Sequence, residues 1–144
     1  MSADRAFIDT NVFIYYQHSD NPKKHKISED TINFFDCVVS TQVLNEICNI
    51  LTRKYPIPVS DIVKFISDIV QSSDLVVNND VIIKKALDYY SRYSISYYDA
   101  LIVSAAVVSN CKYLISEDMQ DGLIIDNKLQ ILNIYAHTDM FIVR

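Results

Sequence analysis

Five acidic residues of this sequence have the chemistry to hold a divalent metal ion. They are Asp9, Glu46, Asp99, Asp118 and Asp121. Mg²⁺ and Mn²⁺ are hard cations that prefer oxygen ligands, and Mg²⁺ takes one or two carboxylates while it keeps several waters. Two such ions about 3.5–4 Å apart activate a water and stabilise the leaving oxygen of an in-line phosphodiester displacement. If these five side chains converge, we expect them to be the catalytic and metal-binding residues of a phosphodiesterase.

Taken singly, each acid also has an ordinary structural explanation. An Asp at a strand end, such as Asp9, is most often a turn former or a helix cap. Glu46 alone is more often a solvated helix residue, and acids such as Asp118 and Asp121 are common in polar loops like that of residues 116–122. Asp99 is more informative, because a nearly unbroken apolar run follows it and a buried charge needs a partner. The prediction therefore depends on the set.

The segments around these acids predict strands that alternate with helices. Short apolar runs bounded by polar residues predict buried strands, at residues 6–8, 37–39, 75–77, 113–115 and 130–135. Apolar residues at helical spacing predict helices, at about residues 12–18, 28–35, 41–54, 60–70, 82–90 and 99–108. We expect Ser60 to cap the fourth of these helices. The alternation indicates an α/β fold with a central, mostly parallel sheet of four to five strands.

In such sheets, functional groups gather beyond the carboxyl ends of the strands. Asp9 closes the first predicted strand, and Asp118 and Asp121 follow the fourth within a few residues. Asp99 opens the apolar helix before the fourth strand, and Glu46 belongs to the helix that follows the second. All five acids are thus expected at one edge of the sheet.

The composition of the chain bears on the number of domains and on nucleic-acid binding. The chain has 144 residues, of which 50% are hydrophobic and 22% are charged, so we expect one self-folding domain over residues 1–144. The net charge of −5 argues against a nonspecific nucleic-acid binder, because phosphates are held chiefly by Lys and Arg. A cluster of catalytic acids contributes much of that charge, and bound divalent metal would offset it locally.

The cysteines and the N-terminal segment bear on the compartment. Cys37, Cys48 and Cys111 are odd in number and show no C-x-x-C spacing, which favours neither a disulfide framework nor a zinc ribbon. The charges at Asp4 and Arg5 leave no room for the apolar stretch of a signal peptide. No apolar run approaches the roughly 20 residues of a membrane span. We therefore expect a cytoplasmic protein with no membrane partner.

Four segments of the chain resemble the PIN-domain family, and within it the VapC-type toxins of prokaryotic toxin–antitoxin modules. They are FIDTNVFIY at 7–15, VVSTQVLNEI at 38–47, YYDALIVSAA at 97–106 and LISEDMQDG at 114–122. The resemblance implies a three-layer α/β/α sandwich and a Mg²⁺- or Mn²⁺-dependent endoribonuclease that cuts single-stranded or loop regions of RNA. It also implies a cognate antitoxin as partner and a homodimer, for which the apolar helix at residues 62–70 offers one candidate face.

The resemblance assigns roles to individual residues. Asp9, Glu46 and Asp99 match the first three acids of the family, Asp118 matches a position that is Asn or Asp, and Asp121 matches the acid three residues later. Which of the last two is the better ligand stays open. Other matching polar residues support the site by orienting its ligands through hydrogen bonds; they are Thr10, Asn11, Ser40 and Ser116. Many relatives carry Arg or Lys beside the fourth acid, where this chain has Glu117 and Gln120.

Two other functions remain open at this point. Haloacid-dehalogenase-type phosphatases also place an Asp after the first strand, but their motif needs a second Asp two residues on, where Asn11 stands. A catalytically silent PIN-like module that binds RNA or protein would keep the fold without cleavage. Divalent-dependent cutting of RNA distinguishes the nuclease from this module, and phosphate release from small phosphomonoesters identifies the phosphatase.

Overall fold

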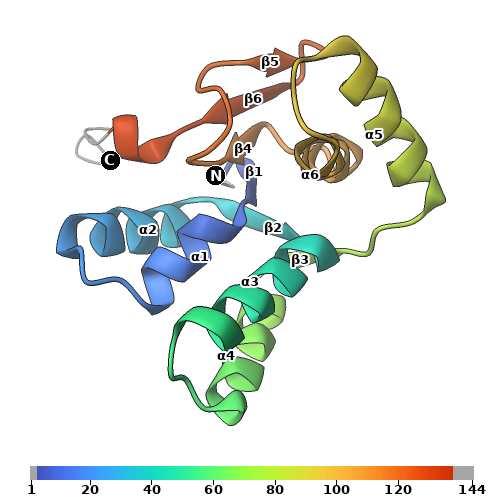
Figure 1. Cartoon of the computed structure of the whole chain (residues 1–144). Coiled ribbons are helices and arrows are strands. Elements are labelled where there is room, and N and C mark those ends of the chain that lie inside the picture. The colour runs from blue at the N-terminus through green and yellow to red at the C-terminus, as the bar shows by residue number, and fades with distance from the viewer. Residues whose placement is uncertain (1–2, 138–144) are drawn as a thin grey trace.

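The strands of the protein form one mixed sheet that carries the rest of the fold (Figure 1). The computed structural model describes residues 3–137. The sheet order is β3-β2-β1-β4-β6-β5, and all neighbours are parallel except β5 and β6. The strands span Arg5–Ile8 (β1), Asp36–Ser40 (β2), Asp74–Val76 (β3), Tyr113–Ile115 (β4), Ile124–Ile125 (β5) and Leu129–Leu132 (β6).

Helices connect the parallel strands and cover the sheet. They span Thr10–Gln17 (α1), Pro22–Phe34 (α2), Thr41–Lys54 (α3), Val59–Ser72 (α4), Asp80–Arg92 (α5) and Tyr97–Val108 (α6), and a 3₁₀ turn, η1, covers Ile134–Ala136. Parallel crossovers are right-handed, so the helices before β3 and those after it lie on opposite faces. Figure 1 shows α1 and α2 on one side of the central strands and α5 and α6 on the other. The α/β/α sandwich predicted from the sequence is confirmed.

The core is packed against both faces of the central strands. Phe7, Ile8 and Val38 are fully buried, which explains why these strands read as unbroken apolar runs. The helix α6 is buried nearly all round, from Ala100 to Ala106, because it fills the space between the sheet and α5. Asp99 is therefore attached to a helix that is packed on nearly all sides. No helix in the described range is long and apolar enough to cross a bilayer.

Local sequence signals account for most boundaries but not all. The last predicted strand, at residues 130–135, ends at Leu132, and Ile134–Ala136 forms the 3₁₀ turn. The helix α3 has the predicted bounds, whereas α2 begins at Pro22, capped by Asn21, well before the expected start. Ser60 is not a cap: α4 begins at Val59, after Pro58, and Ser60 lies within its first turn. No side chain caps this helix; the Pro58 carbonyl instead accepts hydrogen bonds from the backbone N–H groups of Asp61 and Ile62, at 3.0 and 3.2 Å.

The sheet has one strand more than the four to five predicted. The extra strand, β5, forms an antiparallel hairpin with β6. Asp126 and Asn127, in the three-residue loop between the two strands, both have positive φ, 54° and 55°, the left-handed conformation that Asn and Asp adopt in tight turns. A strand of two residues gives too little alternation for periodicity to detect it.

Candidate functional site

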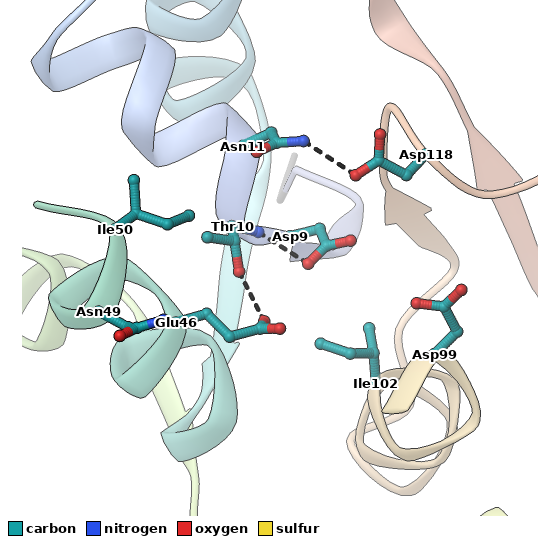
Figure 2. Close-up of a pocket in the computed structure, with 9 residues that line it drawn as sticks. All are labelled: Asp9, Thr10, Asn11, Glu46, Asn49, Ile50, Asp99, Ile102 and Asp118. Carbon is teal, nitrogen blue, oxygen red and sulfur yellow. Dashed lines mark hydrogen bonds between the residues drawn. The ribbon is translucent and has the colours of Figure 1, made fainter. Parts of the chain in front are cut away.

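Four of the five predicted acids line one open cavity at the carboxyl edge of the sheet (Figure 2). Asp9 follows β1, Glu46 lies in α3, Asp99 lies in the first turn of α6, and Asp118 lies in the loop after β4. The cavity has a volume of about 270 Å³. The other residues that line it are Thr10, Asn11, Asn49, Ile50 and Ile102.

Asp9 is the acid most strongly affected by its surroundings. Its carboxylate accepts hydrogen bonds from the backbone N–H of Thr10 at 2.7 Å and from the hydroxyl of Ser116 at 2.9 Å. Burial, and to a smaller extent the carboxylates of Glu46 and Asp99, raises the pKa of Asp9 from 3.8 to about 6 against these hydrogen bonds. Within residues 3–137, no Lys, Arg or His side chain lowers this pKa, and only neutral donors oppose the effect of burial.

The other three acids are held by neutral donors. The hydroxyl of Thr10 donates to Glu46 Oε1 at 2.8 Å, and Asn11 Nδ2 donates to Asp118 Oδ2 at 3.0 Å. Burial raises the pKa of Asp99, and repulsion from Asp118 adds to the rise, while a hydrogen bond with Ser96 opposes it. Thr10, Asn11 and Ser116 thus each hold one of these acids by a hydrogen bond.

The oxygen donors of the cavity suit a hard cation, although the acidic side chains are not close enough together to hold one as they stand. Among residues 3–137, no three His, Cys, Asp or Glu side chains lie close enough together to hold a metal ion as they stand. Carboxylates facing one another repel when no cation lies between them. The donors offered to the cavity are oxygens, apart from the amide nitrogens of Asn11 and Asn49, and its open side leaves room for the waters that Mg²⁺ retains. In ligand chemistry the residues fit a Mg²⁺ or Mn²⁺ ion.

Asp121 and Ser40 lie elsewhere than in the cavity lining. The Asp121 carboxylate accepts a hydrogen bond from the backbone N–H of Asn133 at 2.8 Å and contacts His137 Nε2 at 2.8 Å. The hydrogen bond from Asn133 has the largest effect and lowers the pKa of Asp121, and the contact with His137 lowers it further. Ser40 is fully buried and caps α3, accepting from the backbone N–H of Val43. Asp121 thus ties the loop after β4 to the segment after β6, and Ser40 fixes the start of the helix that carries Glu46.

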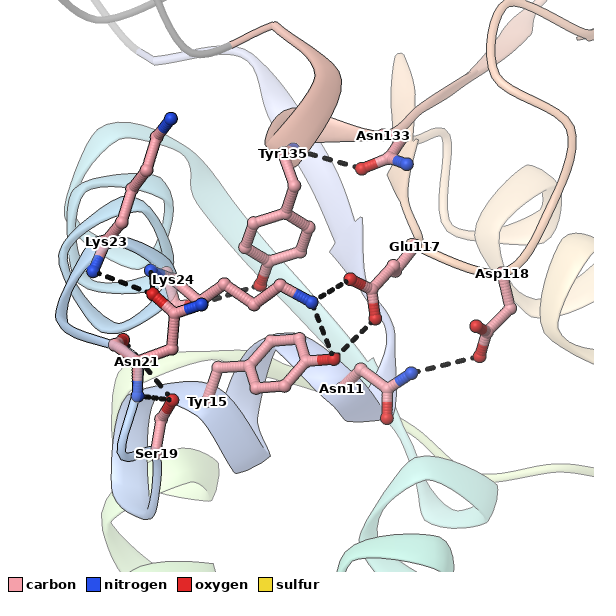
Figure 3. A network of polar contacts seen from close by, with 11 residues as sticks. Asn11, Tyr15, Ser19, Asn21, Lys23, Lys24, Glu117, Asp118, Asn133 and Tyr135 are labelled. Carbon is pink, nitrogen blue, oxygen red and sulfur yellow. Dashed lines mark hydrogen bonds and ion pairs between the residues drawn. The ribbon is translucent and has the colours of Figure 1, made fainter.

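A polar network that sequence reasoning missed supports the loop of Asp118 (Figure 3). Lys24, in α2, forms a 2.7 Å ion pair with Glu117, the residue before Asp118. The Tyr15 hydroxyl also donates to Glu117, at 2.6 Å, and the Lys24 ammonium lies 4.6 Å from the centre of the Tyr15 ring. A cation therefore reaches the neighbourhood of Asp118 from a distant helix, although the motif itself has Glu117 and Gln120 rather than Arg or Lys near this acid. Lys24 lies before residue 28, where the sequence predicted this helix to begin, so the sequence did not indicate the ion pair.

Replacing Lys24 by Met should destabilise the protein by about 1–2 kcal/mol, because Glu117 is mostly buried and would lose its charged partner. Urea denaturation measures the change. Lys64→Met is the matched control, since the pair that Lys64 forms with Asp68 is exposed and its loss should cost less than about 0.5 kcal/mol. Equal effects of the two substitutions would contradict a supporting role for Lys24.

Comparison with known proteins adds to this geometry. A family model described as PIN domain matches residues 6–136. No curated protein sequence matches the chain at a significant level. Among solved structures, the chain is similar to VapC20 of Mycobacterium tuberculosis, described as a toxin that cleaves the sarcin–ricin loop. The TM-score is 0.64 and the identity 14%, over 78% of this chain and 91% of that one.

Two further structures have the same fold. A toxin–antitoxin complex from Klebsiella pneumoniae matches with a TM-score of 0.67 and 13% identity, over 90% of this chain and 98% of that one. VapBC2 from Rickettsia felis, bound to a DNA fragment from its promoter, matches with a TM-score of 0.65 and 14% identity, over 90% of this chain and 99% of that one. At such identities the likeness concerns the fold.

Proposed function

This chain belongs to the PIN-domain family, and we propose that it is a Mg²⁺- or Mn²⁺-dependent endoribonuclease. The observation that carries the proposal is the convergence of Asp9, Glu46, Asp99 and Asp118, from four separate elements, on one cavity. Bringing several carboxylates together and partly burying them costs free energy. A bound cation offsets this cost. PIN domains are typically metal-dependent nucleases, which agrees with this donor set.

Within this proposal, each residue of the cavity has a defined task. Asp9, Glu46, Asp99 and Asp118 hold the metal, which when bound polarises the phosphodiester and lowers the pKa of an attacking water. Thr10 fixes one oxygen of Glu46 and leaves the other free. Ser116 and the Thr10 N–H each donate a hydrogen bond to one oxygen of Asp9. These two bonds fix the orientation of its carboxylate.

We assign the fourth ligand position to Asp118 rather than to Asp121. Asp118 lines the cavity, and its single hydrogen bond to Asn11 leaves an oxygen available. Both oxygens of Asp121 are engaged, one by Asn133 and the other by His137. Asp121 accordingly acts on the reaction only by holding the loop in place.

The structural relatives support a proposal about the biological setting. VapC20 is described as a toxin, the Klebsiella pneumoniae structure is a toxin–antitoxin complex, and VapBC2 is bound to a DNA fragment from its promoter. We propose that this chain is the toxin of a type II module, with RNA as substrate, a cognate antitoxin as inhibitor and a homodimer as its free form. An antitoxin segment with a basic side chain would neutralise the acidic cavity.

A catalytically silent binding module is the second candidate, because the acids stand apart within the described range. A cleavage assay separates the two. Purified protein and a structured RNA with single-stranded loops should give discrete fragments with Mg²⁺ or Mn²⁺ and none with EDTA. Phosphate release from a small phosphomonoester should stay at background. RNA binding without metal-dependent fragments would establish the silent module, and phosphomonoester turnover would establish a phosphatase.

A further inference from the structure

A second cavity adjoins the acidic one and has a different chemistry. It has a volume of about 550 Å³, and Glu46 and Asn49 line both cavities. It lies where the N-termini of α3 and α6 meet the loop after β3. The residues that line it are Thr41, Gln42, Asn45, Glu46, Asn49, Asn78, Tyr98 and Leu101. Its volume falls within the range of about 300–1,000 Å³ that is typical of small-ligand sites.

Side-chain amides dominate this second cavity. Gln42 Nε2 donates to the backbone carbonyl of Tyr98 at 3.3 Å, and the backbone N–H of Asn78 donates to Thr41 Oγ1 at 3.3 Å. These bonds hold the three elements together around the cavity. Each amide offers both donors and acceptors, which is the combination that the edge of a nucleobase needs.

Two of these amides are left incompletely bonded. Among the described residues 3–137, the buried side-chain nitrogen and oxygen atoms without a hydrogen-bond partner are Gln42 Oε1 and Asn78 Oδ1, and both belong to residues of this cavity. Buried polar atoms are nearly always bonded, so each exception needs an explanation. Both acceptors lie within the cavity wall, out of contact with solvent, so a ligand that brings N–H donors would bond them after the Gln42 and Asn78 side chains turn toward it.

The remaining features select an aromatic, uncharged ligand. Tyr98 exposes 66% of its surface, and its ring packs edge-on against Tyr97 with 5.4 Å between the ring centres. An exposed ring held in this way is a platform on which a base stacks. Leu101 adds an apolar surface, and the one charged residue, Glu46, disfavours a phosphate at this place.

We propose that this second cavity, the amide cavity, binds an unpaired nucleobase of the RNA whose backbone passes the four acids. The inference rests on the proposed function, because it takes RNA as the substrate. Glu46 and Asn49 line both cavities, so the two lie side by side, and a nucleotide next to the cleaved phosphate would be within reach of the amides. A paired base has its hydrogen-bonding edge occupied, so the amide cavity selects single-stranded or loop regions.

The test is a titration of the full chain in EDTA with each of the four ribonucleosides, followed by the side-chain amide NMR signals of Gln42 and Asn78. At least one nucleoside should shift these signals saturably. Tyr98→Ala should weaken that binding about tenfold, as expected for one lost stacking contact. Tyr90→Ala is the matched control, since Tyr90 is 53% exposed on α5 and lines neither cavity, and it should bind like the wild type.

Cleavage kinetics give a second, separate readout. Tyr98→Ala should raise KM for RNA about tenfold with kcat nearly unchanged, because the base contact is the same before and during the reaction. The proposal that the amide cavity is a base site would be wrong if no nucleoside bound, or if Tyr98→Ala left nucleoside binding unchanged. It would also be wrong if Tyr98→Ala left KM unchanged. Saturable, Tyr98-dependent binding by a chain that cleaves no RNA would support the base site and reject the nuclease proposal.

Discussion

Asp99→Asn should lower kcat for RNA cleavage by about 10²–10³-fold, whereas Asp121→Asn should remain within a few-fold of the wild type. A metal ion supplies several kcal/mol of charge stabilisation to the transition state, and each 1.4 kcal/mol corresponds to about tenfold in rate. Asp99 faces the cavity from a rigid, buried helix, so its neutral replacement leaves the ion short of one charge. The measurement is single-turnover cleavage at saturating Mn²⁺.

Asp121→Asn is the control for Asp99→Asn, because Asp121 does not line the cavity. Asp118 and Asp121 lie three residues apart in one loop, but only Asp118 lines the cavity. Asp118→Asn should show an intermediate loss of about tenfold, because Asp118 is exposed and water screens its charge more than that of the partly buried Asp99. If Asp121→Asn were as damaging as Asp99→Asn while its melting temperature stayed unchanged, the assignment of the fourth ligand to Asp118 would be wrong.

Asp9→Asn should stabilise the metal-free protein at pH 7.5 by about 1–3 kcal/mol. The pKa of Asp9 is about 6 in the folded protein and near 3.8 in the unfolded chain. One pKa unit corresponds to about 1.4 kcal/mol, so the charged form of this buried side chain opposes folding at neutral pH. Asn keeps an oxygen for the Thr10 N–H and removes the charge. Urea denaturation in EDTA measures the gain.

The pH dependence of this effect has a defined sign. A carboxyl whose pKa is raised by folding favours the folded state below pH 4, and its contribution is lost as the pH rises through about 6. The difference between Asp9→Asn and the wild type should therefore vanish near pH 4 and grow toward pH 7. Mn²⁺ should raise the melting temperature of the wild type and not that of the variant. A variant less stable than the wild type at pH 7.5 in EDTA would refute the buried-charge argument.

Much of this arrangement is readable from sequence because its signals are local. A strand that is buried on both faces is a continuous apolar run, so the ends of β1 and β4, and with them Asp9 and Asp118, could be located. The stripe of apolar residues in α3 fixed its bounds and placed Glu46 at its border. The uniformly apolar α6 marked Asp99 as partly buried.

Other features depend on contacts between distant residues and have no local signal. Asp118 and Asp121 share one loop, and the bonds that Asp121 makes with Asn133 and His137 separate their roles. Lys24 reaches Glu117 across 93 positions of the chain. The start of α2 was set too late because its first turns are polar, although Asn21 followed by Pro22 is a helix-start signal.

The central position of β1 has a consequence for the protein during its synthesis. Asp9 donates its backbone N–H to the carbonyl of Ile115, and β1 pairs with β4 along its length. The newly made N-terminal half thus has no partner for one edge of β1 until β4 has left the ribosome. A nascent or truncated chain lacking β4 also lacks Asp118, so the four acids of the cavity come together only after residue 118 has left the ribosome.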